Sequence, residues 1–232
     1  IKHLKVLEKK WVAEAELRNW IQSHPEEREK LIRLFSSLEL SYSNRRETNR
    51  ALAYFGESFI NGPELVQLAL EILNFDFEAE EKLVITRMKK LLEKYDNLNL
   101  SIDKEVFAAM LKEYRSKVDK KYLPAMYLQI DTLYNGNVQT YVDSLYATSQ
   151  ITSPKGLKRF LERDTTYNLI EAPAISLSLD LIVKYYEMNQ SVSEASEQIE
   201  QDERLFNAAM RRMYADRNFY PDANSTMRLS FG

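Results

Sequence analysis

The sequence predicts an all-α fold, an irregular multi-helix bundle of about ten helices, followed by a short C-terminal extended segment. Only 5 glycines and 6 prolines interrupt the 232 residues, and the long intervals between them carry apolar residues at helical spacing. Hydrophobic residues make up 44% of the chain and charged residues 29%, as in globular domains. No fixed-period repeat is present, which favours a bundle over a solenoid.

The first three helices are predicted from one wide apolar stripe and from two sets of breaking residues. The stripe covers residues 1–22, and Pro25 suits the first turn of a second helix that ends near Leu40. A third helix is expected from about Asn44 to Ile60. Asn61-Gly62-Pro63 then forms a break, in which the glycine suits the position after a helix end.

Three further helices are expected before residue 120. The fourth is short and apolar, and the acidic run from Asp76 to Glu81 precedes the fifth, whose apolar face extends to Tyr95. Ser101-Ile102-Asp103 offers N-cap residues for the sixth helix, which continues past Tyr114. The residues from Leu98 to Ser101 are also a candidate boundary between two helical halves.

The second half of the chain predicts helices bounded by prolines, glycines and small polar residues. They are expected from about 124 to a turn at 135–136, and over 138–146, 154–162, 177–188 and 193–215. The most apolar long run, residues 172–183, contains Asp180 and is too short to span a bilayer. No membrane span is therefore expected.

Residues 218–232 are predicted to be a separate element that follows an α-helical domain over residues 1–217. Turn-forming residues come first, and apolar residues then alternate with polar ones, which is the period of a half-buried strand. A lone strand cannot satisfy its own backbone groups or bury one face alone. Its partners would therefore belong to a β structure outside this chain. The candidate connector residues are Tyr220, Pro221, Asp222, Asn224 and Arg228.

The sequence contains no recognisable catalytic or ligand-binding motif. Its two histidines, His3 and His24, stand in no metal-binding pattern, and there are no cysteines. The nucleophile elbow, the Walker A sequence and the dinucleotide-binding glycine pattern are all missing from it. We therefore expect no catalytic residues, no metal and no cofactor. His24, which precedes Pro25, is expected to mark a helix boundary.

Charge and aromatic content bear on the possible partners. The net charge is −3 and the basic residues form scattered pairs, so no nucleic-acid partner is expected. Tyrosines recur through the middle third of the chain: Tyr114, Tyr122, Tyr127, Tyr134, Tyr141 and Tyr146. Packing of their rings in the core explains most of them. A concave surface that faces a ligand is the alternative interpretation.

Both ends of the chain resemble one family. The run YPDANSTMRLSFG, Tyr220 to Gly232, resembles the segment after the helical domain in the bacterial dipeptidyl-peptidase 7 and 11 family of serine exopeptidases. IKHLKVLEKKWVAEAELRNW, Ile1 to Trp20, looks like the helix that opens the main part of that domain. The resemblance implies a chymotrypsin-like double β-barrel with a His, Asp and Ser triad. An α-helical domain inserted between the Asp and the Ser covers the cleft and restricts cleavage to the release of N-terminal dipeptides.

No triad residue can be carried over to this sequence. The resemblance therefore implies a cap domain that is inert when isolated, with a connector (residues 218–232) that returns to the barrel. Its partners would be the catalytic β-barrel of the same polypeptide and the peptide substrates of the full enzyme. The family also implies a periplasmic or secreted location. The alternative is a stand-alone helical module that binds a partner protein or peptide through its tyrosine-rich middle.

Overall fold

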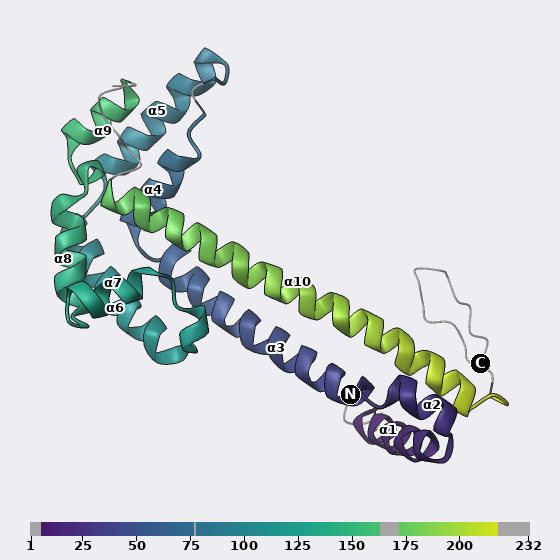
Figure 1. Ribbon diagram of the computed structural model, residues 1–232. Helices are drawn as coiled ribbons and strands as arrows, with labels where there is room; N and C mark the ends of the chain where they lie inside the picture. The colour runs from purple at the N-terminus through teal and green to yellow at the C-terminus, as the bar shows by residue number, and fades with distance from the viewer. Residues whose placement is uncertain (1–5, 77, 163–171, 218–232) are drawn as a thin grey trace. The chain divides into compact units, whose positions relative to one another are not determined.

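The chain is all-α in the residues that a computed structural model describes, namely 6–76, 78–162 and 172–217 (Figure 1). Within these ranges there are ten α-helices, short 3₁₀ and π-helical turns, and no β-strand, which confirms the predicted fold class. Backbone contacts divide the chain into two compact units. The first unit contains residues 1–44 and 194–232, and the second unit contains residues 45–193.

The first unit is built from two short helices and parts of two long ones. They are α1 (Val6–Ser23), α2 (Pro25–Leu31), the beginning of α3 (Leu34–Phe55) and the end of α10 (Pro173–Met213). Its core is a small apolar cluster: Leu17, Ile21, Leu31, Leu34 and Ala209. Two side-chain hydrogen bonds join α3 to α10 here, from Ser37 Oγ to Asp202 at 2.5 Å and from Tyr42 Oη to Glu203 at 2.5 Å.

The second unit holds most of the helices and the larger core. It continues α3 through a π-helical turn, η2 (Gly56–Ile60), and it includes the beginning of α10. Between these lie α4 (Glu64–Leu73), α5 (Glu81–Asp96), α6 (Leu100–Lys117), η3 (Lys120–Tyr122), α7 (Met126–Leu133), α8 (Val138–Thr148), η4 (Gln150–Thr152) and α9 (Pro154–Leu161). The helix α4 contributes the most continuous apolar face, because five of its ten residues are buried.

One predicted break lies in the wrong place. The sequence indicated an end near Leu40 and a new start near Asn44, but α3 runs through both residues without interruption. The break falls instead at Ile32 and Arg33, between α2 and α3. Ser41 is buried, and Ser and Asn cost only a few tenths of a kcal/mol relative to most helix formers, so burial outweighs their low helix propensity.

The two helices expected over residues 177–188 and 193–215 are one helix, α10, of 41 residues. No glycine or proline interrupts this stretch. Met188, Ala195 and Ile199 are all buried, so the apolar stripe continues across the proposed gap. The polar residues between 189 and 194 decorate the helix surface rather than end it.

Two local predictions also need correction. The N-cap of α6 is Asn99, whose side chain accepts a hydrogen bond from Ile102 N at 3.2 Å, and Asp103 has another role.

Gly62 is not needed for a left-handed conformation. A Cβ there would lie 2.7 Å from the carbonyl oxygen of Glu57, so the glycine permits close approach of the backbone.

The boundary considered near Leu98 to Ser101 lies inside the second unit, where Leu98 and Leu100 pack against the core. The turn at Asn135-Gly136 is confirmed, since both residues have positive φ angles of 51° and 77°. Among the described helices, none combines the length and the apolar character that crossing a membrane requires.

Candidate functional site

The predicted connector lies outside the described residues. Tyr220, Pro221, Asp222, Asn224 and Arg228 all fall within 218–232, so the division into residues 1–217 and 218–232 stays a prediction. In the part of the chain that the structure describes, no group of three or more potential metal-ligating side chains is present. A candidate site must therefore be sought among the polar groups of the helices.

His24 marks a helix boundary, as predicted. It occupies the N-cap position of α2, and its ring stacks on Trp20 with the ring centroids 4.4 Å apart. Its Nδ1 lies 2.8 Å from the carbonyl oxygen of Trp20 and 3.1 Å from Ser23 Oγ. The imidazole is thus held by the end of the preceding helix, α1, which is a structural arrangement.

Five of the six tyrosines of the middle third belong to the core: Tyr114, Tyr122, Tyr127, Tyr146 and Tyr141. This confirms the packing interpretation for them. Tyr114 and Tyr127 are buried, and their hydroxyls donate to the carbonyl oxygens of Tyr122 at 2.9 Å and Leu111 at 2.8 Å. The Tyr122 hydroxyl lies 3.0 Å from Thr48 Oγ1. In these three cases the ring fills the core while the hydroxyl finds a protein partner.

Tyr146, another core tyrosine, donates to a buried carboxylate that ties three helices together. Asp103 on α6 accepts from the Tyr146 hydroxyl on α8 at 2.6 Å. It also accepts from the first backbone N–H groups of α4, those of Glu64 at 2.7 Å and Leu65 at 2.9 Å. An anion at this end of a helix satisfies orphan donors and complements the helix dipole.

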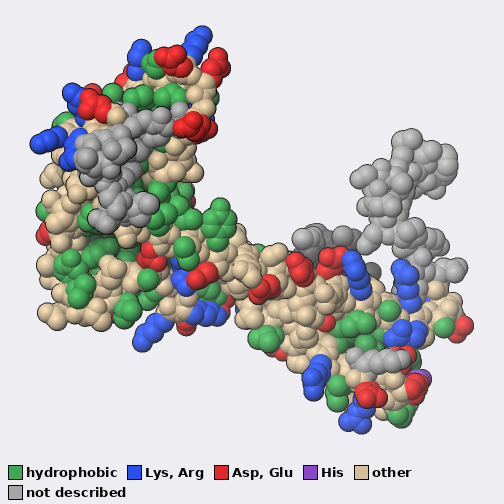
Figure 2. Space-filling model, turned by 45° about the horizontal axis from the view of Figure 1, so that its top comes forward, with side chains coloured by type: hydrophobic (Ala, Val, Ile, Leu, Met, Phe, Trp, Pro, Cys, Tyr) green, Lys and Arg blue, Asp and Glu red, His purple; other side chains and the backbone are tan. Residues whose placement is uncertain are grey.

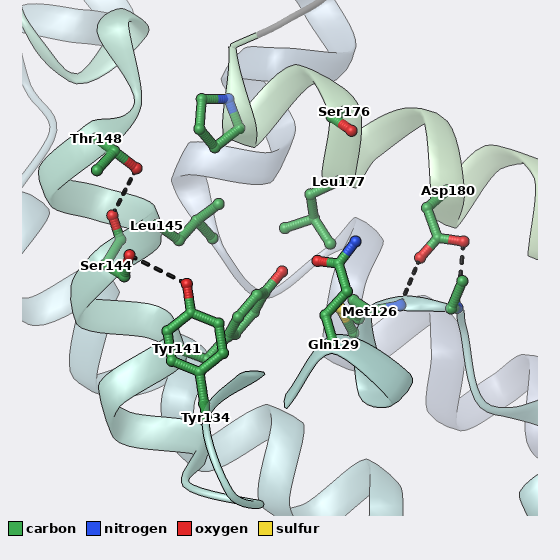
Figure 3. Close-up of a pocket in the computed structure, with 12 residues that line it drawn as sticks. Met126, Gln129, Tyr134, Tyr141, Ser144, Leu145, Thr148, Ser176, Leu177 and Asp180 are labelled. Atoms are coloured by element: carbon green, nitrogen blue, oxygen red, sulfur yellow. Dashed lines mark hydrogen bonds between the residues drawn. The ribbon is translucent and has the colours of Figure 1, made fainter. Parts of the chain in front are cut away.

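Asp180 plays the same part for α7. Its two carboxylate oxygens accept from the backbone N–H groups of Ala125 at 3.2 Å and Met126 at 2.9 Å, as the dashed lines of Figure 3 show. The carboxylate belongs to α10, and Asp180 lies 54 residues after Met126, the first residue of α7. Unlike Asp103, Asp180 is only partly buried, because it lines a cavity.

This cavity lies within the second unit, where α7, α8 and the beginning of α10 meet (Figure 3). Its volume is about 410 Å³, within the range of small-molecule sites, about 300–1,000 Å³. The lining residues are Ala125, Met126, Gln129, Tyr134, Tyr141, Ser144, Leu145, Thr148, Pro173, Ser176, Leu177 and Asp180. The wall is mixed: apolar side chains alternate with hydroxyls, one amide and one carboxylate.

Tyr134 and Tyr141 face this cavity. Tyr134 donates to Ser144 Oγ at 3.2 Å and packs edge-on against Tyr141, with ring centroids 5.5 Å apart. Tyr141 is only 6% exposed, yet its hydroxyl has no hydrogen-bond partner among the described residues and points in among the lining side chains in Figure 3. The sequence offered the alternative of a ligand-facing surface, and these two tyrosines are the ones to which it applies.

The cavity keeps its tyrosine neutral. Burial raises the pKa of Tyr141 well above its usual range, and the charges of Asp180 and Tyr134 raise it further. The hydroxyl therefore stays protonated and can both donate and accept at physiological pH. Its position at the cavity was not predictable from spacing alone, because Tyr134 and Tyr141 follow the same pattern as the other four tyrosines of the middle third.

Comparison with known proteins places the whole chain in one family. The pattern of the family Peptidase S46 matches residues 1–232. The chain is 30% identical over 206 residues to dipeptidyl-peptidase 7 of Porphyromonas gingivalis, covering 86% of this chain and 28% of that protein. It is 24% identical over 203 residues to the Asp/Glu-specific dipeptidyl-peptidase of the same organism, covering 84% of this chain and 28% of that protein.

A solved structure shares the fold. The crystal structure of Porphyromonas endodontalis DPP11 matches with a TM-score of 0.60 at 17% sequence identity, over 94% of this chain and 32% of that one. The chain thus spans about a third or less of the length of these relatives, and its helical fold corresponds to a helical portion of them. Since the family pattern covers every residue, the chain belongs to the Peptidase S46 family.

Proposed function

We propose that this chain is the helical cap domain of a longer serine dipeptidyl-peptidase. In that enzyme it covers the active-site cleft and restricts cleavage to the release of N-terminal dipeptides. The observation that carries the proposal is the match of the Peptidase S46 family to residues 1–232, in a chain that spans 28% of its dipeptidyl-peptidase relatives. The catalytic serine is then expected in another part of the same polypeptide.

The polar groups of the described helices support a non-catalytic role. Asp103 accepts three hydrogen bonds that hold helices together, and both oxygens of Asp180 accept backbone N–H groups of α7. His24 is hydrogen-bonded to the end of the preceding helix, α1. The strongest candidates for acid–base chemistry are thus already engaged in structural contacts. We propose that the isolated chain is inert.

Exposed apolar side chains support contact with further protein. On α5, Leu83, Ile85 and Leu92 are 43%, 46% and 41% exposed. Leu83 and Leu92 belong to the predicted apolar face of this helix, of which Leu91 is buried. Figure 2 shows apolar side chains at several places on the surface of the second unit. Apolar surface of this kind is expected where a domain meets the rest of its enzyme.

A cover of this kind acts through exclusion. It leaves space for only a fixed length of substrate beyond the reacting bond, and its motion can limit turnover. The family resemblance implies a periplasmic or secreted location, which we propose for this chain, and the lack of cysteines agrees with it. Cell fractionation of the native host tests this location, and recovery of the protein in the cytosol alone would refute it.

The covering role is tested by replacing residues 1–217 with a short flexible linker in the full-length protein. Labelling with a fluorophosphonate then reports whether the catalytic part is still folded. If the proposal is right, the labelled variant cleaves peptides whose amino terminus is acetylated and releases products longer than dipeptides. A variant that labels normally but still releases only dipeptides from free amino termini would show that residues 1–217 do not set product length.

The alternative of a stand-alone binding module makes a different prediction about the gene. It requires that the reading frame contain no catalytic domain on either side of these residues. Reading the flanking sequence distinguishes the two proposals directly. Labelling of a serine within residues 1–232 would contradict both.

A further inference from the structure

The cavity between α7, α8 and α10 contains a buried hydroxyl without a protein partner. A buried polar group that lacks a hydrogen bond costs about 1–3 kcal/mol, so such groups are few in folded proteins. Tyr141 is 6% exposed, and its hydroxyl makes no hydrogen bond within the described parts of the chain. The other five tyrosines of the middle third all have protein partners. The exception lies in a cavity of about 410 Å³, which is large enough for a ligand of moderate size.

The charge of the cavity wall selects the ligand. Among the described residues that line the cavity, Asp180 is the only one with a charged side chain, and none is a lysine or an arginine. A single carboxylate in a partly enclosed space repels anions and attracts cations. Only one hydrogen bond is made to each of its oxygens, which leaves further acceptor positions on both.

The same contacts favour an ammonium over a guanidinium group. A guanidinium binds a carboxylate best through two parallel hydrogen bonds to its two oxygens. The two oxygens of Asp180 already accept hydrogen bonds from the backbone N–H groups of Ala125 and Met126, at 3.2 Å and 2.9 Å. The edge of the carboxylate that a guanidinium would bind is therefore occupied. An ammonium needs only single acceptors in several directions, which one Asp180 oxygen and a nearby hydroxyl can supply.

The apolar part of the wall suits an aliphatic stem. Met126, Leu145 and Leu177 line the cavity beside the polar groups. A lysine side chain buries its methylene groups along apolar surface and keeps its charged end at polar groups. Gln129 and Ser176 also line the cavity and are exposed, which places an amide and a hydroxyl within reach of peptide backbone groups.

We propose that this cavity binds the lysine side chain of a peptide, with the ammonium group at Asp180 and a hydrogen-bond acceptor of the peptide at the Tyr141 hydroxyl. The site lies wholly within the second unit and needs no residue of a catalytic domain. It goes beyond the proposed function and is independent of it. Its test involves binding only and no hydrolysis.

The test uses the full-length protein and end-blocked probes. N-acetyl-lysine methylamide carries the ammonium group, N-acetyl-norleucine methylamide has nearly the same shape without the charge, and N-acetyl-arginine methylamide carries a guanidinium. Their affinities are measured by ligand-observed NMR titration. The lysine probe is expected to bind at least tenfold more tightly than the norleucine probe and more tightly than the arginine probe.

Two variants locate the binding. Tyr141→Phe removes the hydroxyl alone and is expected to weaken the lysine probe about five- to tenfold without lowering the unfolding midpoint, because the hydroxyl has no protein partner to lose. Asp180→Asn keeps an oxygen for α7 and is expected to weaken the lysine probe at least tenfold without changing the norleucine probe. The matched control is Tyr127→Phe, whose hydroxyl donates to Leu111. It is expected to lower the unfolding midpoint by about 3 °C and to leave binding unchanged.

Each opposite result would overturn the proposal. Equal affinities of the three probes would show that the charge of Asp180 does not select the ligand. Unchanged binding in Tyr141→Phe and Asp180→Asn would place the lysine probe elsewhere on the protein. Absence of binding by every probe would show that the cavity holds water only.

Discussion

The hydroxyl of Tyr146 on α8 donates a 2.6 Å hydrogen bond to the carboxylate of Asp103 on α6, which also accepts the first two N–H groups of α4. Asp103 is 4% exposed, so three helices meet at one buried anion. Its hydrogen bonds to Glu64 N and Leu65 N span 39 and 38 residues of sequence. This junction links the elements of the second unit in a way that apolar packing alone does not specify.

The first prediction concerns this anion. Asp103→Ala removes the acceptor of three hydrogen bonds and leaves their donors buried, so it is expected to lower the free energy of unfolding by about 3 kcal/mol. Asp103→Asn retains one oxygen acceptor and is expected to lower the free energy of unfolding by less, about 1–2 kcal/mol. Urea denaturation followed by far-ultraviolet circular dichroism measures both.

Tyr146→Phe provides the matched comparison, because it removes only one of the three donors. In a double-mutant cycle, Asp103→Ala and Tyr146→Phe are expected to be coupled by about 1 kcal/mol, since the two residues share a hydrogen bond. Additive effects, or a loss below about 0.5 kcal/mol in Asp103→Ala, would show that the junction contributes little.

A second prediction concerns two glycines with opposite surroundings. A Cβ at Gly156 on α9 would lie 2.0 Å from the carbonyl oxygen of Gln150 on η4, whereas a Cβ at Gly56 would meet nothing within 4 Å. Gly156→Ala is therefore expected to lower the free energy of unfolding by about 3 kcal/mol, through displacement of α9 from η4.

Gly56→Ala is the matched control. It makes the same chemical change in helical backbone with open space around it, so it is expected to raise the free energy of unfolding by about 0.5–1 kcal/mol. Thermal and urea unfolding of the two variants give the comparison. Equal effects of the two substitutions would contradict the close packing of α9 on η4.

A third prediction concerns alkaline pH. Burial raises the pKa values of Tyr114, Tyr127, Tyr141 and Tyr146 well above the ordinary value of 10.0. The charge of Arg115 opposes this increase at Tyr127 but does not cancel it. In the unfolded chain these tyrosines lose their protons near pH 10, while in the folded chain they keep them. Stability is thus unaffected below pH 10 and falls as the pH rises above it.

The dependence of the free energy of unfolding on pH is measurable. Each of these tyrosines lowers this free energy by up to about 1.4 kcal/mol per pH unit above its unfolded pKa. Tyr141→Phe removes one of them and is expected to reduce this pH dependence by that amount. Tyrosinate absorbance should therefore rise together with the loss of helical circular dichroism. Ionisation of these four tyrosines while the helices remain intact would contradict their burial.

The fold class was predictable because helical periodicity is local. Long apolar stripes and the scarcity of glycine and proline determine it, and the turn at Asn135-Gly136 follows from two residues that tolerate positive φ. Helix ends were less predictable. Ser41 and the polar residues near 190 resemble boundaries in sequence, but both lie inside continuous helices because buried neighbours outweigh their small propensity cost.

Long-range contacts were the least predictable part. Asp103 was expected to cap its own helix, since it follows Ser101 in a sequence typical of a helix start, but it caps α4. Asp180 gave no signal beyond its position in an apolar run, and it caps α7. Tyr141 shares its spacing with the other core tyrosines, so only the cavity distinguishes it. The connector residues 218–232 lie outside the described chain, and their role stays a prediction.

The central proposal is that residues 1–217 cover an active site whose nucleophile lies elsewhere in the polypeptide. It is tested most directly by labelling the full-length protein with a fluorophosphonate that carries a photo-reactive diazirine, followed by irradiation and peptide mapping. We predict a labelled serine outside residues 1–232 and photo-crosslinks from it to peptides within residues 1–217. A labelled serine within residues 1–232, or crosslinks that never reach residues 1–217, would contradict the proposal.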